Sequence, residues 1–191
     1  MKNRGGTLSK SPTLFIDVFL AGKVEKKLLK LRSGAKPGDK IYVTGSFGGS
    51  IEGRHYNFQP RVKEARYVIK KHPVSSMMDV SDGLSSDLIR LAKTSNTGFV
   101  LYMDNIPVSM SAVKISRTEK EAVFHALNDG EDYELIFTVD KNYRGEIPEK
   151  IDSVPVTCIG EMTAVKKYEG FFKNEKISLR PGGFNHFKNL L

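Results

Sequence analysis

The sequence is poor in cysteine and has no tryptophan: Cys158 is the single cysteine among 191 residues. One cysteine cannot form a disulfide within a chain, which fits a reducing cytoplasm, and within an apolar stretch we expect it to be a small buried side chain. No apolar run approaches the roughly 20 residues that a bilayer-spanning helix needs. No apolar core of a secretory signal follows residues 1–6. The sequence therefore predicts a cytoplasmic chain without a membrane partner.

The sequence also lacks the motifs of nucleic-acid-binding modules, although it is basic. Its 30 Lys and Arg against 22 Asp and Glu give a net charge of +8, which attracts anions such as nucleic acids, membrane surfaces or phosphorylated small molecules. The positive residues stand in short clusters, as on a solvated face, and no zinc-ligand spacing or aromatic RNA-binding motif is present. We therefore expect no nucleic-acid partner. No nucleophile–base pair stands out either, which argues against a covalent hydrolase.

Helical and strand patterns are mixed along the chain without strict alternation. We predict helices at 60–71, 84–92 and 111–127 and strands at 13–24, 41–44, 98–103, 133–139 and 154–162. This pattern predicts an α+β fold, with helices packed on a mixed or antiparallel sheet. The turn at Pro37 and Gly38 predicts a boundary between residues 1–36 and a domain over 37–191. The strand at 13–24 is apolar on both faces and needs neighbours, which suggests that the beginning of its domain is missing.

Residues 45–50, GSFGGS, form a glycine-rich loop after a predicted strand. Successive N–H groups in such a loop can surround a phosphate. The loop lacks the Gly-Lys-Ser/Thr ending of a P-loop, so a plain strand-to-helix connection is the favoured interpretation.

Residues 79–88, DVSDGLSSDL, contain the sharpest candidate site. Asp79 ends an apolar run, and Ser81 and Asp82 stand where a helix is predicted to begin. Two carboxylates at this spacing can share one Mg²⁺ and bridge it to nucleotide phosphates, which a helix N-terminus also attracts. Ser and Asp are equally good helix caps, and Asp-Gly is a turn signal, so spacing alone favours neither function nor capping. Asp87, one turn into the helix, is expected to be exposed.

Two further segments could bind a ligand. Residues 128–135, NDGEDYEL, put four acidic residues before an apolar strand, where they could bind a metal or a cation; a solvated turn is the favoured interpretation. Residues 182–187, GGFNHF, put aromatic residues on a glycine hinge. Their rings could stack on a flat ligand or simply dock the tail. His186 could act as a general base, although a lone histidine is more often structural.

Together these segments resemble the thiamine-monophosphate kinase family of the aminoimidazole ribonucleotide synthetase-like superfamily. The resemblance covers nearly the whole chain, and its matching segments occur in the family's order: 31–45, 60–62, 78–88, 126–135, 159–160 and 183–187. The DVSDGL and GEDYEL motifs are specific as a pair. The resemblance implies that residues 37–191 form the C-terminal α+β domain. It also implies that residues 1–36 are the remnant of an N-terminal dimerisation and ATP-binding domain.

The resemblance implies transfer of the γ-phosphoryl group of ATP to thiamine monophosphate, giving thiamine diphosphate. Such in-line transfer needs positioning and charge neutralisation by metal ions rather than a protein nucleophile. By their positions in the family's motifs, Asp79 and Asp82 would hold Mg²⁺. Ser81 and Arg32 would contact ATP.

The resemblance also implies the substrate contacts. Glu131 and Asp132 lie where the family has its thiamine-binding acid, and Phe184 would stack on the thiamine ring. Relatives have a longer N-terminal region with further magnesium-binding acids, and Thr7 stands where they have an aspartate. We therefore expect the chain alone to transfer phosphoryl groups very slowly or not at all.

Three alternatives remain open at this point. The chain could act as a homodimer of the family's kind, or as a non-catalytic remnant or binding subunit that pairs with a separate N-terminal half. It could also belong to another branch of the superfamily, such as aminoimidazole ribonucleotide synthetase, hydrogenase maturation or selenophosphate synthesis.

Overall fold

The structure is a computed structural model that describes residues 18, 19 and 21–182. Its centre is an eight-stranded sheet in the order β2-β4-β1-β6-β3-β7-β8, with β5 paired to β6 off this path. The strands are β1 Lys40–Thr44, β2 Val74–Asp79, β3 Gly98–Tyr102, β4 Leu135–Val139, β5 Lys150–Ile151, β6 Val154–Thr163, β7 Tyr168–Phe172 and β8 Glu175–Ser178. The pairing of β3 with β7 is parallel and the others are antiparallel, which confirms the predicted α+β class with a mixed sheet.

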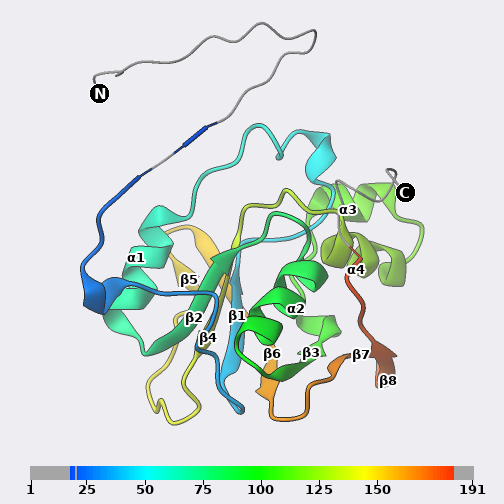
Figure 1. Cartoon of the computed structure of the whole chain (residues 1–191). Coiled ribbons are helices and arrows are strands. Elements are labelled where there is room, and N and C mark those ends of the chain that lie inside the picture. Colours follow the sequence, from blue (N-terminus) through cyan, green and yellow to red (C-terminus); the bar gives the residue numbers. More distant parts are fainter. Residues whose placement is uncertain (1–17, 20, 183–191) are drawn as a thin grey trace, which may run out of the picture.

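Helices lie on both faces of the sheet (Figure 1), and a cluster of buried apolar side chains packs against each face. The helices are α1 Val62–Lys71, α2 Leu84–Thr94, α3 Met110–Ile115 and α4 Glu119–Asn128, with short 3-10 turns η1 Lys26–Leu28, η2 Ser50–Glu52 and η3 Met103–Asn105. All five residues of β4 are buried. Ile136 joins the larger cluster beneath α2 and α4, whereas Leu135 and Phe137 join Val68 of α1 in the smaller one. This alternation follows from the two-residue period of a strand.

The helix predicted over 111–127 is in fact two helices. α3 ends at Ile115, and Ser116 is extended. Thr118 then caps α4, its side chain accepting a hydrogen bond from the Glu121 N–H at 3.1 Å. A threonine at the N-cap position favours the start of a new helix. The helical spacing of apolar residues continues through both helices, so this spacing alone did not reveal the break between them.

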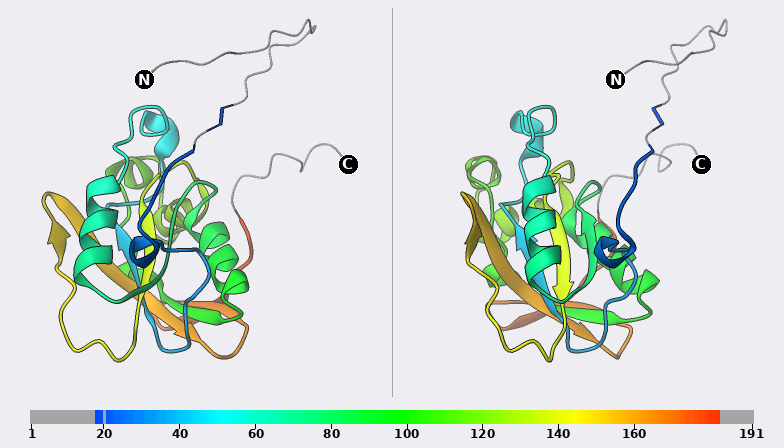
Figure 2. Two further views of the ribbon diagram at one scale, coloured as in Figure 1. Left: turned by 60° about the vertical axis from the view of Figure 1, so that its left-hand side comes forward. Right: turned by 90° about the vertical axis from the view of Figure 1, so that its left-hand side faces the viewer.

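The strand predicted over 13–24 is not formed in its described part. Residues 18, 19 and 21–24 have no regular structure, and Val18, Phe19 and Val24 are exposed. No strand of the described sheet pairs with these residues, so their backbone groups have no neighbouring strand with which to form sheet hydrogen bonds. This segment runs along the outside of the molecule beside α1 (Figure 2).

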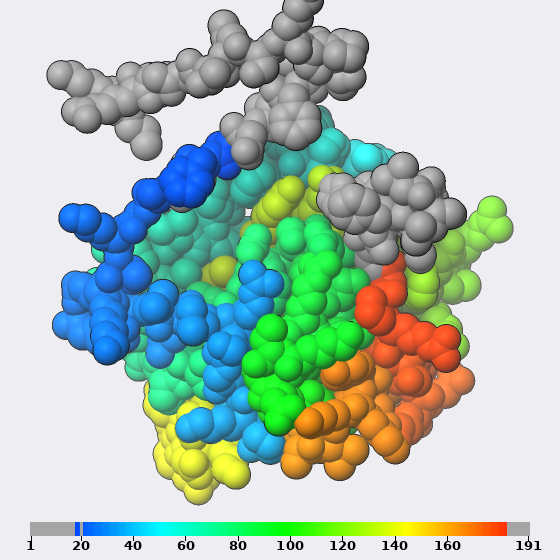
Figure 3. Space-filling view, viewed as in Figure 1, coloured from blue at the N-terminus to red at the C-terminus, as the bar shows by residue number. Residues whose placement is uncertain are grey.

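Residues 31–36 contact the sheet and α2. The Met77 N–H donates to the Leu31 carbonyl at 2.9 Å, and the Ala35 N–H donates to Ser95 Oγ at 3.2 Å. At the other end, the segment after β8 lies over the surface beside α2 (Figure 3). In the described ranges, no helix is both long and apolar enough to cross a membrane.

Candidate functional site

Pairing of β2 with β4 brings the two acidic motifs together. Asp79, the last residue of β2, lies opposite Leu135, the first residue of β4. Three backbone hydrogen bonds extend this contact beyond the strands: Val80 N–H to Glu134 O at 2.8 Å, Tyr133 N–H to Val80 O at 2.8 Å and Glu131 N–H to Ser81 O at 2.7 Å. The segment that follows β2 (residues 80–83) and the segment that precedes β4 (residues 130–134) thus pack against each other at the ends of the two strands. We call these two segments together the double turn.

Two glycines allow the double turn to close. Gly130 has φ 75°, and a Cβ there would lie 2.9 Å from the Ser81 carbonyl oxygen. Gly83 has φ 106°, and a Cβ there would lie 3.2 Å from the carbonyl group of Asn128. Both positions therefore need a residue that adopts positive φ and has no side chain. This explains the glycine in each motif.

The proposed metal-binding pair lies on the open side of this turn. The Asp79 side chain is exposed, and Asp82 is half-buried. Asp82 pairs with Arg90 at 2.5 Å and accepts a hydrogen bond from Ser81 Oγ at 3.2 Å. Two carboxylates completed by phosphate oxygens and water suit Mg²⁺, so their donor chemistry fits this ion. The described residues contain no group of three or more His, Cys, Asp or Glu side chains that could hold a metal.

Asp87 is buried, which corrects the expectation that it is exposed. Its side chain accepts hydrogen bonds from the N–H groups of Ser81 and Asp82, both at 2.9 Å, and from Arg90 at 2.7 Å. Burial raises the pKa of this carboxyl, while the two N–H groups and Arg90 oppose that shift. The capping interpretation is also corrected. Helix α2 begins at Leu84 after Gly83 without a side-chain cap, and Asp87 binds the preceding turn from inside the helix.

Glu134 is also buried, so the acidic segment is not simply a solvated turn. It is 0% exposed, and its oxygens accept hydrogen bonds from Thr44 Oγ1 at 2.6 Å and from Arg61 Nε and Nη2, both at 2.7 Å. The Arg54 guanidinium binds the same carboxylate. A buried carboxylate needs such partners because an unpaired charge is costly away from water. Glu131 remains exposed.

Asp132 joins the acidic turn to the glycine-rich loop. It is 1% exposed, and Oδ1 accepts a hydrogen bond from the Gly48 N–H at 2.9 Å. Oδ2 has no partner among the described residues. Burial raises the pKa of this carboxyl to about 7. Gly49 donates in turn to Asp129 at 2.7 Å, so side chains of the acidic turn occupy these N–H groups. This supports the loop as a structural connection rather than a phosphate cradle.

Sequence reasoning missed an aromatic pair at the same turn. The rings of Phe58 and Tyr133 stack with centroids 4.1 Å apart. The pKa of Tyr133 is raised, first by burial and then by the charges of Glu131, Asp79 and Asp82. Pairing between a loop residue and a distant turn leaves no local signal in the sequence.

Sequence reasoning also missed the arginine partners of Glu134. Arg54 and Arg61 reach Glu134 from positions 80 and 73 residues away. The sequence offered a single signal, which is that Glu134 directly precedes an apolar strand. A glutamate buried at that position would need a positively charged partner.

One predicted site residue, Arg32, is not brought to this turn. Arg32 is exposed, and its carbonyl accepts a hydrogen bond from Thr94, the last residue of α2. Ser81 and Asp82 precede the first turn of the same helix, whose 11 residues span about 16 Å. Phe184 lies outside the described residues, as does Thr7.

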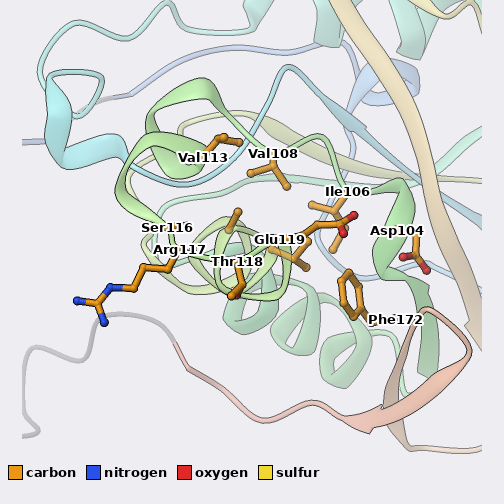
Figure 4. Close-up of a pocket in the computed structure, with 11 residues that line it drawn as sticks. Asp104, Ile106, Val108, Val113, Ser116, Arg117, Thr118, Glu119 and Phe172 are labelled. Carbon is orange, nitrogen blue, oxygen red and sulfur yellow. The ribbon is translucent and has the colours of Figure 1, made fainter.

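Two hollows lie near α4. One, of about 490 Å³, is formed by η3, α3, α4 and β7, with Ile106, Val113 and Phe172 in its lining and Arg117 turned outward (Figure 4). The other, of about 690 Å³, follows α4 and β8. Its lining includes Ser85 of α2 and Asn128, the last residue of α4, which are joined by a hydrogen bond of 2.9 Å.

Comparison with protein families finds a match over most of the chain. The family model for the C-terminal domain of AIR synthase related protein matches residues 50–173. That range contains β2, α2 and β4, and therefore both acidic motifs.

Curated relatives of similar sequence are thiamine-monophosphate kinases. The protein from Buchnera aphidicola subsp. Schizaphis graminum is 35% identical, over 96% of this chain and 63% of the relative. That from Rhodopirellula baltica is 36% identical, over 95% of this chain and 58% of the relative. That from Escherichia coli K12 is 36% identical, over 96% of this chain and 62% of the relative. The chain thus spans about three-fifths of the length of these relatives.

Solved structures share the fold at lower identity. Thiamine-monophosphate kinase from Stenotrophomonas maltophilia K279a has a TM-score of 0.63 at 24% identity, over 77% of this chain and 54% of that one. AaThiL complexed with AMPPCP and TMP has a TM-score of 0.61 at 23% identity, over 82% and 53%. The hydrogenase maturation protein HypE of E. coli has a TM-score of 0.63 at 14% identity, over 85% and 55%.

Proposed function

The chain belongs to the AIR synthase related protein family, and we propose that it provides the C-terminal domain of a thiamine-monophosphate kinase. The reaction would transfer the γ-phosphoryl group of ATP to the phosphate of thiamine monophosphate and give thiamine diphosphate. One observation carries the proposal: the DVSDGL and GEDYEL motifs form a single double turn, in which Val80 donates to Glu134 and Glu131 donates to Ser81. The curated relatives, at 35% and 36% identity, support the same activity.

In this proposal Asp79 and Asp82 hold Mg²⁺ with ATP. When bound, the ion would neutralise negative charge on the acceptor phosphate and on the leaving phosphates of the nucleotide. Arg90, which pairs with Asp82, would have to exchange this contact for one to Asp87 alone or to a phosphate. Ser81 contacts ATP, and Asp87 fixes the main chain of that turn. We also propose Arg32 as a second residue that contacts ATP. Arg32 lies beyond the far end of α2, so the geometry of the double turn does not support this role.

The acidic turn supplies the substrate contact. Glu131 is exposed, so its carboxylate is free to face the cationic thiazolium or the aminopyrimidine of thiamine. Asp132 is buried and holds Gly48, which supports a role in shaping the turn rather than in touching substrate. Phe184 is proposed to stack on the thiamine ring. We place the reaction in the cytoplasm, as the single cysteine suggests.

A binding subunit is the alternative function. Val18, Phe19 and Val24 are exposed at 75%, 89% and 58%. Such a run of exposed apolar side chains favours contact with another polypeptide, either a second copy of this chain in a homodimer or a separate N-terminal half. A phosphoryl-transfer assay with and without such a partner distinguishes this alternative from a kinase that is active alone.

The proposal is tested by ligand binding to the 191-residue chain. We expect calorimetry to detect binding of thiamine monophosphate and magnesium-dependent binding of ATP. Asp79→Asn should weaken the binding of magnesium-ATP at least about tenfold, equivalent to about 1.4 kcal/mol, because a neutral amide loses the charge that holds the ion.

The matched control is Asp152→Asn, an exposed acid in the turn between β5 and β6 that has φ 52°, a conformation asparagine tolerates. It should bind both ligands as the unmodified chain does. Absence of thiamine monophosphate binding, or equal magnesium-ATP affinity in Asp79→Asn, would contradict the proposal.

A further inference from the structure

Phe58 and Tyr133 form an aromatic pair beside the exposed carboxylates. Phe58 lies in the loop before α1, and Tyr133 lies in the acidic turn before β4. Their rings are stacked, with centroids 4.1 Å apart and planes inclined by 28°. Phe58 is 38% exposed and Tyr133 is half-buried, so part of the pair remains open to a ligand.

The backbone that presents this pair is strained. Glu131 and Tyr133 have φ of 53° and 52°, a left-handed conformation that is unfavourable for residues with a side chain and more so for a bulky one. Hydrogen bonds from their N–H groups to Ser81 and Val80 hold the conformation. Strain of this kind persists where the surrounding structure enforces it, and it clusters at ligand sites.

The charge beside the pair is negative. Asp79 and Glu131 are exposed, and together with Asp82 they act electrostatically on Tyr133. The neighbouring cations of the loop, Arg54 and Arg61, are directed to the buried Glu134 instead. The open aromatic surface is therefore bordered by carboxylates that these arginines do not neutralise.

The aromatic contact is not needed to attach the loop. Arg54 and Arg61, which flank Phe58 in the sequence, already join the loop to the start of β4 through Glu134. Arg54 also donates to the Ser46 carbonyl at 2.6 Å. A loop held at both ends would keep its place with a smaller side chain at residue 58, so the exposed ring is available for recognition.

We propose that Phe58 and Tyr133 are specificity-determining residues that bind the flat, cationic ring of the substrate, with the Glu131 carboxylate opposing its charge. An aromatic face attracts a cation and stacks with a flat ring, and a carboxylate at the edge favours a cationic ring over a neutral one. The inference rests on the proposed function, in which the substrate carries a thiazolium ring. It adds two residues from the loop and the turn to that site.

The test measures binding of thiamine monophosphate to variants of the full chain. Phe58→Leu keeps an apolar side chain but removes the aromatic face, and it should raise Kd about tenfold. Phe58→Tyr should restore binding to within about twofold, because it keeps the ring. By NMR, the ring protons of the ligand should shift upfield on binding to the unmodified chain and much less with Phe58→Leu.

The matched control is Tyr56→Leu in the same loop. Tyr56 is 77% exposed and contacts His55 edge-on, so removal of its ring should leave Kd unchanged. Magnesium-ATP binding should be unchanged in all three variants, and thermal unfolding should show each to be folded. A Phe58→Leu variant that loses stability but binds thiamine monophosphate normally would show a structural role and overturn the inference.

The two proposals fail differently. If the unmodified chain does not bind thiamine monophosphate, the proposed function fails and the inference falls with it. If the unmodified chain binds and Phe58→Leu binds equally well, with the same upfield shift, the proposed function stands and the aromatic pair is not part of the site.

Discussion

At the residue scale, Asp87 uses its carboxylate entirely within the protein. One oxygen accepts the N–H groups of Ser81 and Asp82, and the other accepts Arg90. The carboxylate thus satisfies two backbone donors that precede the helix and would otherwise lack partners. The turn that carries the proposed metal ligands is thus held by a carboxylate that is itself buried.

Replacement of Asp87 should therefore cost stability. Asp87→Ala leaves the two N–H groups without their acceptor, and we expect the free energy of unfolding to fall by about 2 kcal/mol or more. Asp87→Asn retains one carbonyl acceptor and should lose about half as much. Urea unfolding measures both.

Glu146→Ala is the control for Asp87, since Glu146 is exposed. It should change the free energy of unfolding by less than about 0.5 kcal/mol. Equal effects of Asp87→Ala and Glu146→Ala would mean that the buried carboxylate does not support the turn.

At the element scale, one carboxylate joins α1 to β4 and β1. Arg61 stands immediately before α1, Glu134 immediately before β4, and Thr44 ends β1. Arg61 binds Glu134 through two nitrogens, both at 2.7 Å, and Thr44 donates to the same carboxylate at 2.6 Å. A two-nitrogen contact fixes the direction of the guanidinium as well as its distance. The relative position of these elements thus depends on a buried ion pair.

Arg61→Met should strongly destabilise the protein. It keeps most of the apolar length of the side chain but leaves Glu134 with Arg54 as its single cation, and breaking a buried pair from one side costs about 3 kcal/mol. The measurement is urea unfolding at neutral pH. Arg66→Met is the matched change within α1, because Arg66 is exposed, and it should have little effect. Similar losses in both variants would contradict a dominant role for the ion pair.

At the scale of the whole molecule, Asp132 makes stability depend on pH. Burial raises the pKa of its carboxyl to about 7 in the folded state, from an ordinary value of 3.8. Between about pH 4 and pH 7 the folded protein holds a proton that the unfolded chain has released. This contribution to stability is therefore complete below about pH 4 and is lost as pH rises through 7.

The part of the pH dependence of stability that Asp132 contributes should disappear in Asp132→Asn. An amide can still accept the Gly48 N–H but carries no charge at any pH, so the variant should match the unmodified chain near pH 4. At pH 8 it should exceed that chain by up to about 4 kcal/mol. Urea unfolding at several pH values gives the free energy of unfolding of both proteins. The contributions of the other titrating groups cancel in the difference between the two values. A difference that is constant from pH 4 to pH 8 would contradict an elevated pKa at Asp132.

Local pattern in the sequence determined most of the elements. A strand such as β4 follows from a short continuous apolar run, and a helix such as α2 follows from an apolar period of about 3.6 residues; both patterns depend on neighbouring residues alone. The Asp-Gly steps of both motifs indicated turns, because glycine adopts positive φ without strain. The sequence also identified the two motifs as specific to the family when they occur as a pair, and β2 and β4 bring them side by side.

Only the tertiary structure decided which charges are buried and what binds them. Asp87 and Glu134 look like surface residues in the sequence, since acidic side chains are rarely buried. Arg54 and Arg61, which neutralise Glu134, lie 80 and 73 residues away from it. Phe58 and Tyr133 likewise meet only because the loop is drawn onto the turn. Burial and partners depend on long-range packing, and no local pattern contains that information.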